Sequence, residues 1–361
     1  MAKPSTQSTA FVRVATLDVS LGRMDGGGMR VHAFLKALER ENCVVDTIRL
    51  GPRGSEAVDK VIDDPLHRLK RRLLPVPLRG RTEGQLPAGQ GFGRTISLIP
   101  GAHRWALRNK PTWLDFFDLY SGIAQNQART VDPCSALVNL AQARVWAKRE
   151  HAESAEADVV SAASWSDSLR LGGGAVWLPT PVTEQRTLCG RRSRRSNEAG
   201  QLVYGMLANF HYPPNVDAYR RLVREWLTPL LPTASRIVVA GFASETLPRV
   251  PNVDILGAIP SVEEFYDSVD VVVVPIERGG GMKVKVVEAM THGIPVLATE
   301  HALTGLPEAI ADEAAKWGQS VLHKRDPREN PAVANALGDF TAGSFQRKFS
   351  ALWKSRMQGN D

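Results

Sequence analysis

Residues 271–299 read VVVVPIERGGGMKVKVVEAMTHGIPVLAT, and this stretch decides the fold of the second half of the chain. The four valines before Pro275 are typical of a strand that is buried on both faces of a parallel sheet. The glycines at 279–281 predict a loop, and the apolar residues after them recur at helical spacing until Gly293 ends the pattern. The apolar run 294–299 predicts the next strand. Strand, glycine loop, helix and strand make a βαβ unit, which belongs in a parallel sheet with a right-handed crossover.

The start of the predicted helix has the features of an anion site. Its glycines let the backbone approach a ligand closely, and the free amides and dipole of the helix start favour a diphosphate. Lys283 lies where its ammonium adds positive charge. Gly281, Lys285, Glu288 and His292 share one helix face. Glu288 lies about 10 Å along the axis, which suits the hydroxyls of a ribose. The alternative is that Lys285 and Glu288 form only an exposed ion pair worth a few tenths of a kcal/mol.

The first half of the chain opens with the same order of elements. An apolar, β-prone run at 11–17 leads into Gly26-Gly27-Gly28, then 29–41 has helical spacing and 44–50 predicts a second strand. The sequence therefore predicts an α/β fold with two different Rossmann-like halves. A dinucleotide-dependent oxidoreductase is disfavoured, because bulky Val31 stands where the third glycine of its fingerprint is required.

Length and composition limit the class of protein. A chain of 361 residues suits two domains of about 150 to 200 residues each. Its residues are 43% hydrophobic and 23% charged, and no stretch approaches the roughly 18 apolar residues that span a bilayer. The cysteines Cys43, Cys134 and Cys189 have no metal-ligand spacing and fit a reducing cytoplasm. Residues 1–10 do not read as a secretory signal, and the net charge of +7 favours anionic partners.

Prolines mark the boundary between the domains, because Pro179 and Pro181 stop a predicted strand at 175–178. The chain therefore divides into an N-terminal domain, a C-terminal domain and a basic amphipathic helix expected to pack back on the N-terminal domain: 1–181, 182–340 and 341–361. The remaining predicted strands are 113–120, 158–163, 202–207, 236–240 and 253–256. The remaining predicted helices are 139–155, 215–227 and one that Ser261 and Glu264 open as a capping box and that ends near Ser268.

Residues 51–111 read as irregular, with one short basic helix. From Arg68 to Arg81 cations alternate with leucines. Such a segment can rest on anionic lipid or form a plain surface loop, and the sequence leaves both open.

Acid and base candidates lie in residues 113–121, which read WLDFFDLYS. Asp115 and Asp118 stand in an apolar frame, where a carboxyl group at the mouth of a cleft has a raised pKa. Asp118 is the preferred base, and the alternative is a pair of residues that caps a helix. His211, alone in a loop, is a weaker candidate.

The stretch Gly279 to Leu306 resembles the donor-binding motif of retaining glycosyltransferases with the GT-B fold, glycosyltransferase family four in particular. That pattern is a strand, G-x-G-x-K-x-K-x-x-E-A-M, then G-x-P-V before a threonine and a Gly-Leu pair. The matching residues are Gly279, Gly281, Lys283, Lys285, Glu288, Ala289, Met290, Gly293, Pro295, Val296, Thr299, Gly305 and Leu306. Weaker resemblances are Tyr212 to Asn215, Gly241, Gly257 to Pro260, Gly26 to Gly28 and Ala157-Asp158 with Ser164.

The resemblance implies a GT-B glycosyltransferase whose two Rossmann-like domains face each other across a cleft, the first binding the acceptor and the second a nucleoside-diphosphate sugar. It implies transfer of a hexose, with retention, to a glycan or lipid-linked acceptor, as in polysaccharide biosynthesis, in the cytoplasm or peripherally at the inner face of the plasma membrane. The donor-binding residues would be Gly27, Gly28, His211, Gly257, Ile259, Gly280, Gly281, Met282, Lys283, Lys285 and Glu288. The catalytic residues would be Asp118, Asp115 and Lys283. No cofactor or metal is expected, because the leaving phosphate can take the acceptor's proton and the sequence lacks an Asp-x-Asp motif.

One departure from the family pattern concerns the sugar. Many members have a second glutamate eight positions before the one that matches Glu288, and Gly280 stands there. A catalytically idle relative that scaffolds polysaccharide assembly and a nucleotide-sugar epimerase of the same fold therefore stay open. Nucleic-acid binding is disfavoured, because no helix-turn-helix, zinc finger or aromatic platform is visible.

Overall fold

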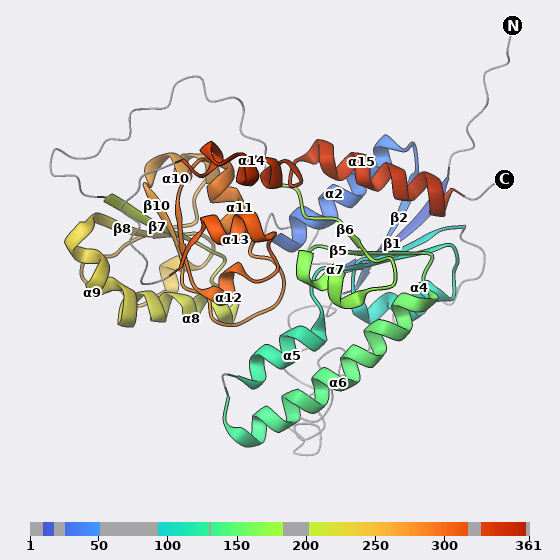
Figure 1. Ribbon diagram of the computed structural model, residues 1–361, viewed down its shortest axis with the longest axis horizontal. Coiled ribbons are helices and arrows are strands. Elements are labelled where there is room, and N and C mark those ends of the chain that lie inside the picture. Colours follow the sequence, from blue (N-terminus) through green and yellow to red (C-terminus); the bar gives the residue numbers. More distant parts are fainter. Residues whose placement is uncertain are drawn as a thin grey trace, which may run out of the picture. The chain divides into compact units, whose positions relative to one another are not determined.

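The computed structural model describes six segments of the chain: 10–17, 26–50, 93–129, 131–182, 202–316 and 326–358. The chain forms two compact units (Figure 1). Unit 1 contains residues 1–181 and 343–361, and unit 2 contains residues 182–342. The first boundary is at the position where the sequence places it, and the C-terminal segment of unit 1 begins two residues after the predicted 341. Arg68 to Arg81 lie outside the described residues.

Unit 1 is built on a parallel sheet with the order β2-β1-β3-β4-β5-β6. Its strands are β1 (Phe11–Leu17), β2 (Val44–Leu50), β3 (Thr95–Ser97), β4 (Thr112–Phe116), β5 (Val159–Ala162) and β6 (Val176–Trp177). The order reverses between β1 and β3, and such a switch point is where doubly wound sheets bind ligands.

Helices cover both faces of this sheet. They are α2 (Gly26–Arg40), α4 (His103–Leu107) after a 3₁₀ turn (Pro100–Ala102), α5 (Tyr120–Ala128), α6 (Pro133–Glu156), α7 (Trp165–Leu171) and α15 (Ala342–Leu352), which continues as a π turn (Trp353–Met357). The core of one face joins α2 and α15 to the sheet, since the rings of Phe34 and Phe349 lie 5.5 Å and 4.9 Å from that of Trp113. Side chains of α4 and α7 form the core of the other face.

Two sequence-based expectations for unit 1 are wrong. The glycines Gly26 to Gly28 do not form a loop, because they are the first turn of α2, with helical backbone. The part of 51–111 that the structure describes is not irregular, since β3 and α4 lie in it. A strand of three residues, all buried, leaves too short a pattern for the sequence to show.

Unit 2 has a parallel sheet with the order β12-β11-β10-β7-β8-β9. Its strands are β7 (Leu202–Leu207), β8 (Ala234–Ala240), β9 (Asp254–Gly257), β10 (Val271–Val274), β11 (Val296–Ala298) and β12 (Ala315–Lys316). Taken in chain order this is 3-2-1-4-5-6 from the β9 edge, the Rossmann order, with its switch point between β7 and β10.

The helices of unit 2 agree with the predicted alternation. They are α8 (Pro213–Arg221), which continues through a π turn (Leu222–Trp226) into α9 (Leu227–Leu230), α10 (Val262–Ser268), α11 (Val284–Thr291), α12 (Glu300–Leu303), α13 (Glu308–Glu313) and α14 (Pro331–Gly338). Three 3₁₀ turns are Leu231–Thr233, Ser244–Thr246 and Pro327–Glu329. Ser261 caps α10 as predicted, accepting a hydrogen bond from the backbone N–H of Glu264 at 3.1 Å.

Candidate functional site

The switch point of unit 2 brings two loops together. The first follows β7 and leads into α8 at Pro213, and the second follows β10 and leads into α11 at Val284. Because β7 and β10 are hydrogen-bonded neighbours and parallel, both loops leave the same edge of the sheet. Open α/β sheets bind ligands in the crevice at this edge.

The glycine loop has a backbone that only glycine adopts without strain. Gly279 has φ 108° and Gly281 has φ 61°. A Cβ atom on Gly279 would lie 3.0 Å from the hydroxyl of Tyr212, which precedes α8. His301 of α12 lies 3.1 Å from the carbonyl oxygen of Gly279 through its Nε2 atom. The loop is therefore held between the start of α8 and α12, and a side chain at Gly279 would crowd the Tyr212 hydroxyl.

Lys283 is the N-cap residue of α11 and folds back over the glycine loop. Its Nζ atom donates hydrogen bonds to the carbonyl oxygens of Gly280 at 2.6 Å and Gly281 at 2.8 Å. The helix starts one residue later, at Val284, so Gly281 is not on its face as the sequence predicts. The ammonium group is thus placed at the helix start, where an anion is most stabilised.

Lys285, in the first turn of α11, is half-buried and bonded to α8. Its Nζ atom donates to Oδ1 of Asn215 at 3.2 Å. Burial, and then the neighbouring charge of Lys283, lowers the pKa of the Lys285 ammonium to about 8. Asn215 in turn donates to the backbone oxygen of Asn209 at 2.7 Å. This chain of contacts joins the helix to the loop after β7.

Glu288 is half-buried one turn further along α11 and faces Tyr266 of α10. The Tyr266 hydroxyl donates to Oε2 of Glu288 at 3.3 Å, and the Tyr266 side chain is 1% exposed. Burial raises the pKa of the Glu288 carboxyl above its usual value, against the lowering effects of Tyr266 and Lys285. The alternative of an exposed Lys285–Glu288 pair is therefore wrong, because both side chains are half-buried and each has a partner on another helix.

The other predicted donor residues of unit 2 lie on the loops at the same edge of the sheet as Lys283, Lys285 and Glu288. Met282 is buried beside the glycine loop. His211 is exposed, and its backbone N–H donates to Oδ1 of Asn209 at 3.0 Å, so it lies in the loop after β7. Gly257 ends the edge strand β9 with φ 78°, and Ile259 follows it. Strand β8 separates β9 from β7, so these two residues lie further along the same sheet edge.

Gly27 and Gly28 belong to unit 1, in the first turn of α2. The βα crossover puts the start of α2 at the carboxyl end of β1, next to the switch point of that sheet. The dipole of a helix favours negative charge near its first turn. The position is therefore compatible with an anion, although as a helix start and not as the predicted loop.

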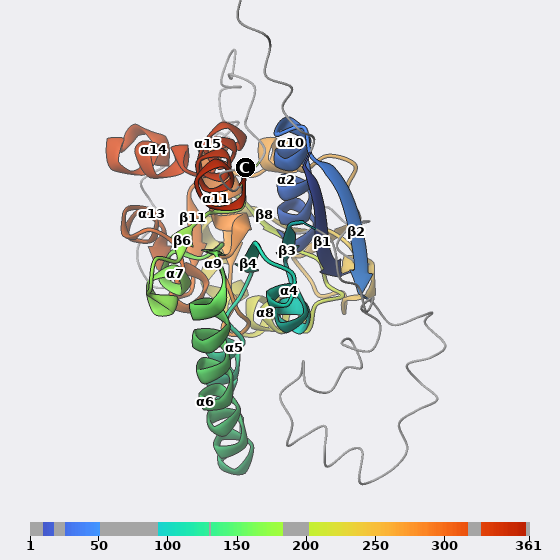
Figure 2. The ribbon, with the colours of Figure 1, turned by 90° about the vertical axis from the view of Figure 1, so that its right-hand side faces the viewer.

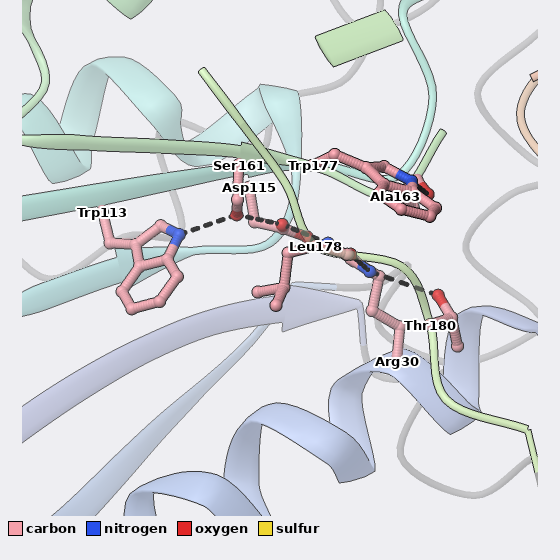
Figure 3. A network of polar contacts seen from close by, with 8 residues as sticks. All are labelled: Arg30, Trp113, Asp115, Ser161, Ala163, Trp177, Leu178 and Thr180. Carbon is pink, nitrogen blue, oxygen red and sulfur yellow. Dashed lines mark hydrogen bonds and ion pairs between the residues drawn. The ribbon is translucent and has the colours of Figure 1, made fainter. Parts of the chain in front are cut away.

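Asp115 does not stand at the mouth of a cleft as the sequence predicts. It is completely buried in β4, where Arg30 of α2, itself 1% exposed, donates to its two oxygens at 2.7 Å and 2.5 Å. Ser161 donates to Oδ1 of Asp115 at 2.5 Å and accepts from Trp113 at 2.7 Å. Arg30 also donates to the backbone oxygen of Leu178 at 2.7 Å (Figure 3). Both oxygens of the Asp115 carboxylate therefore accept hydrogen bonds within the core of unit 1.

Asp118 is partly exposed, between β4 and α5, and a second carboxyl group that the sequence analysis missed lies near it. This is Asp167 of α7, which is 7% exposed. Burial, and then the charge of Asp118, raises the pKa of Asp167 to about 6. Asp118 is thus at the carboxyl edge of the sheet of unit 1, beside a group that titrates near neutral pH.

Two absences concern the described segments only. Within them, no group of three or more His, Cys, Asp and Glu side chains is arranged to hold a metal ion. No helix in the same part of the chain is long and apolar enough to cross a membrane.

Two units with doubly wound parallel sheets, one of them in the Rossmann order, define the GT-B fold. Residues 201–339 match the family described as Glycosyl transferases group 1, and these residues carry the glycine loop and helix α11. The chain is therefore a glycosyltransferase with the GT-B fold. No protein of curated function matches the chain significantly in sequence.

Solved structures with the same fold have low sequence identity. Sucrose-phosphate synthase from Thermosynechococcus elongatus is 15% identical, with a TM-score of 0.62 over 96% of this chain and 98% of that one. A glycosyltransferase from Rickettsia africae is 12% identical, with a TM-score of 0.58 over 98% of this chain and 100% of that one. HepE from Anabaena, in complex with UDP and glucose, is 14% identical, with a TM-score of 0.54 over 95% of this chain and 99% of that one.

Proposed function

We propose that this glycosyltransferase takes a sugar from a nucleoside diphosphate bound in unit 2 and transfers it to a glycan or a lipid-linked acceptor. The observation that carries the proposal is the arrangement of Lys285 and Glu288 on α11. A cation and a carboxylate are held half-buried, one helical turn apart, at the switch point of a Rossmann sheet. Partly buried groups with shifted pKa values at such a position are typical of functional sites.

The proposed donor roles follow from the positions along α11. The amides around Gly280 and Gly281 and the ammonium groups of Lys283 and Lys285 would bind the diphosphate. Glu288 would accept hydrogen bonds from the ribose hydroxyls. Bonds from Lys283 to loop carbonyls would be exchanged for bonds to phosphate, and the same cations would stabilise the diphosphate as it leaves.

The chemistry is proposed to proceed with retention and without a metal ion. The leaving phosphate takes the acceptor's proton on the same face of the sugar, and positioning of the two substrates provides most of the acceleration. Asp118 is proposed to orient the acceptor hydroxyl. Activity should persist in the presence of EDTA, and linkage analysis of the product should show the anomeric configuration of the donor.

Uridine is the first nucleoside to test. The HepE structures are described as complexes with UDP, glucose and UDP-glucose, and a structure of TarM from S. aureus holds UDP, with a TM-score of 0.50. These proteins share the fold and 13 to 14% of their residues with this chain.

The proposal is tested by thermal unfolding with UDP, GDP, ADP and their sugars. A ligand at about 100 times its Kd stabilises by about 2.7 kcal/mol. This should raise the Tm of unit 2 by roughly 5 to 10 °C. Glu288→Gln should remove most of the shift, and Glu264→Gln, an exposed residue of α10, should keep it. Equal shifts in the two variants would show that the ribose contact is assigned wrongly.

Gly280 supports a second candidate, a glycosyltransferase-like protein that binds nucleotide sugars without turnover. A glycine there offers no carboxylate to the sugar. Release of nucleoside diphosphate together with a glycosylated acceptor would exclude this candidate. Binding without release across a broad acceptor panel would favour it, and conversion of one nucleotide sugar to its epimer would favour the epimerase.

A further inference from the structure

The α5–α6 hairpin of unit 1 extends well beyond its sheet (Figures 1 and 2). Helix α6 has 24 residues and is therefore about 36 Å long, whereas the four residues of β5 span about 13 Å. The C-terminal end of α6 leads into β5, and the buried residues of the helix run from Gln142 to Glu153, so none of them is among its first nine residues. The first half of α6 therefore projects past the carboxyl edge of the sheet.

The outer side of α6 and the turn before it expose large apolar side chains together with cations. Leu137 is 69% exposed, Val145 50%, Leu140 42% and Val131, in the turn before α6, 40%. Arg144 and Lys148 are also exposed. One surface, the hairpin face, is formed by six residues: Val131, Leu137, Leu140, Arg144, Val145 and Lys148. On α6 these residues lie on the side opposite the buried ones, since 137, 140, 144 and 148 are spaced by three or four.

The charge of this surface selects the kind of partner. From 133 to 149 the sequence contains no aspartate or glutamate. Two copies of the hairpin face would bring like charges together, which disfavours self-association. A polyanion alone would leave the leucines exposed. The interface of an anionic bilayer suits both the apolar side chains and the cations of the hairpin face. It takes up apolar side chains at the acyl boundary and attracts cations at the headgroups.

We propose that the hairpin face docks on the surface of an anionic lipid bilayer. The contact is peripheral and shallow, with the leucines at the boundary between headgroups and acyl chains and the cations at the headgroups. It places the carboxyl edge of the unit 1 sheet, from which the hairpin rises, toward the membrane. This inference is independent of the donor site, since nucleotide binding and membrane binding are measured separately.

Co-sedimentation with vesicles tests the proposal. The full chain should bind vesicles of phosphatidylcholine mixed with phosphatidylglycerol and not vesicles of phosphatidylcholine alone. The pair Arg144→Gln and Lys148→Gln should lower partitioning about 30-fold, at roughly 5-fold per cation. The exposed cations of α2 supply a charge-matched control, Lys36→Gln with Arg40→Gln, which should bind like the parent.

A second set of variants tests the apolar side chains of the hairpin face. The pair Leu137→Ser and Leu140→Ser should lower partitioning at least about tenfold. Leu169→Ser in α7, at a leucine 65% exposed, should have no effect. Every variant should keep the nucleotide-induced rise in Tm of the parent, which separates a lost surface from a misfolded chain. Equal binding of the parent to both kinds of vesicle, or equal losses in test and control pairs, would overturn the proposal.

Cys134 reports the contact directly. It is an exposed free thiol in the first turn of α6, and burial raises the pKa of the Cys43 thiol to about 11, which leaves it unreactive at neutral pH. With Cys189→Ser, a polarity-sensitive fluorophore can be attached to Cys134. Its emission should shift to the blue with anionic vesicles. Sedimentation without a shift would mean that another surface docks, and a shift that depends only on protein concentration would indicate a dimer.

Discussion

Asp115→Asn tests whether this residue stabilises unit 1 or takes part in the reaction. The carboxylate is completely buried, and Arg30 donates to both of its oxygens. Asparagine has nearly the same shape, so it leaves no cavity. It removes the negative charge, however, and turns an N–H donor toward Arg30 or Ser161, which are donors themselves. A buried guanidinium then remains without its counter-ion.

The expected cost is large for one substitution. Removing one partner of a buried ion pair costs about 3 to 5 kcal/mol, because the other charge stays in the core. Unit 1 has 181 residues from the first segment and 19 from the second, 200 in all. For a unit of that size each kcal/mol lowers the Tm by about 2 to 4 °C, so the Tm should fall by about 6 to 20 °C.

The double variant Arg30→Met with Asp115→Leu provides the control. It replaces both charges with apolar side chains of similar volume, a change that is often neutral or stabilising. Thermal and urea unfolding of the two variants should therefore differ, with the double variant recovering most of the loss. The reasoning is refuted if Asp115→Asn keeps the parent's Tm and loses turnover, since Asp115 would then act on the substrate.

Three further predictions concern unit 2. In the proposed donor site Lys285 binds the diphosphate as the ammonium. Because its pKa is lowered to about 8, affinity for UDP or another accepted nucleotide should fall above pH 8, by up to about tenfold per pH unit. Calorimetry across pH should find no such fall in Lys285→Met. Tyr266→Phe removes one hydrogen bond from Glu288, so the affinity for the nucleotide sugar should drop by roughly 2- to 13-fold. The drop should grow as the pH falls, because Glu288 is then protonated more easily. A loss that does not depend on pH would contradict this. Gly205→Ala places a Cβ atom 2.6 Å from the Val269 side chain. The free energy of unfolding in urea should therefore fall by about 1 to 3 kcal/mol. An unchanged urea midpoint would refute the close packing.

The donor loop and helix could be predicted from sequence because their signals are local. Gly293 has φ 70° and ends the helix, as a C-terminal glycine is expected to do. Val286, Ala289 and Met290 are completely buried, as their helical spacing indicates. Each of these features depends on neighbours within one or two turns, so residue order alone contains the information.

Contacts between distant segments could not be predicted in this way. Tyr266 lies 22 residues before Glu288, and Arg30 lies 85 residues before Asp115. The pairing depends on which helix covers which strand, and no spacing in the sequence encodes that. A weak signal was present for Arg30, which falls on the apolar face of its helix, four residues before Phe34. A cation in that position needs a buried partner.

Asp115 and Asp118 differ because β4 ends between them: Asp115 lies inside the strand and Asp118 lies beyond its end. Side chains alternate along β4, so Asp115 shares the core side of Trp113, while Leu114 and Phe116 face the other core. A carboxylate inside a central strand is surrounded by core and is tolerated only with a buried cation. Asp118 comes two residues after Phe116, the last residue of β4, where the backbone has left the sheet. The strand predicted at 113–120 includes both residues and makes them look alike. Its true end at Phe116 leaves Asp118 outside the sheet, which agrees with the acceptor contact proposed for it.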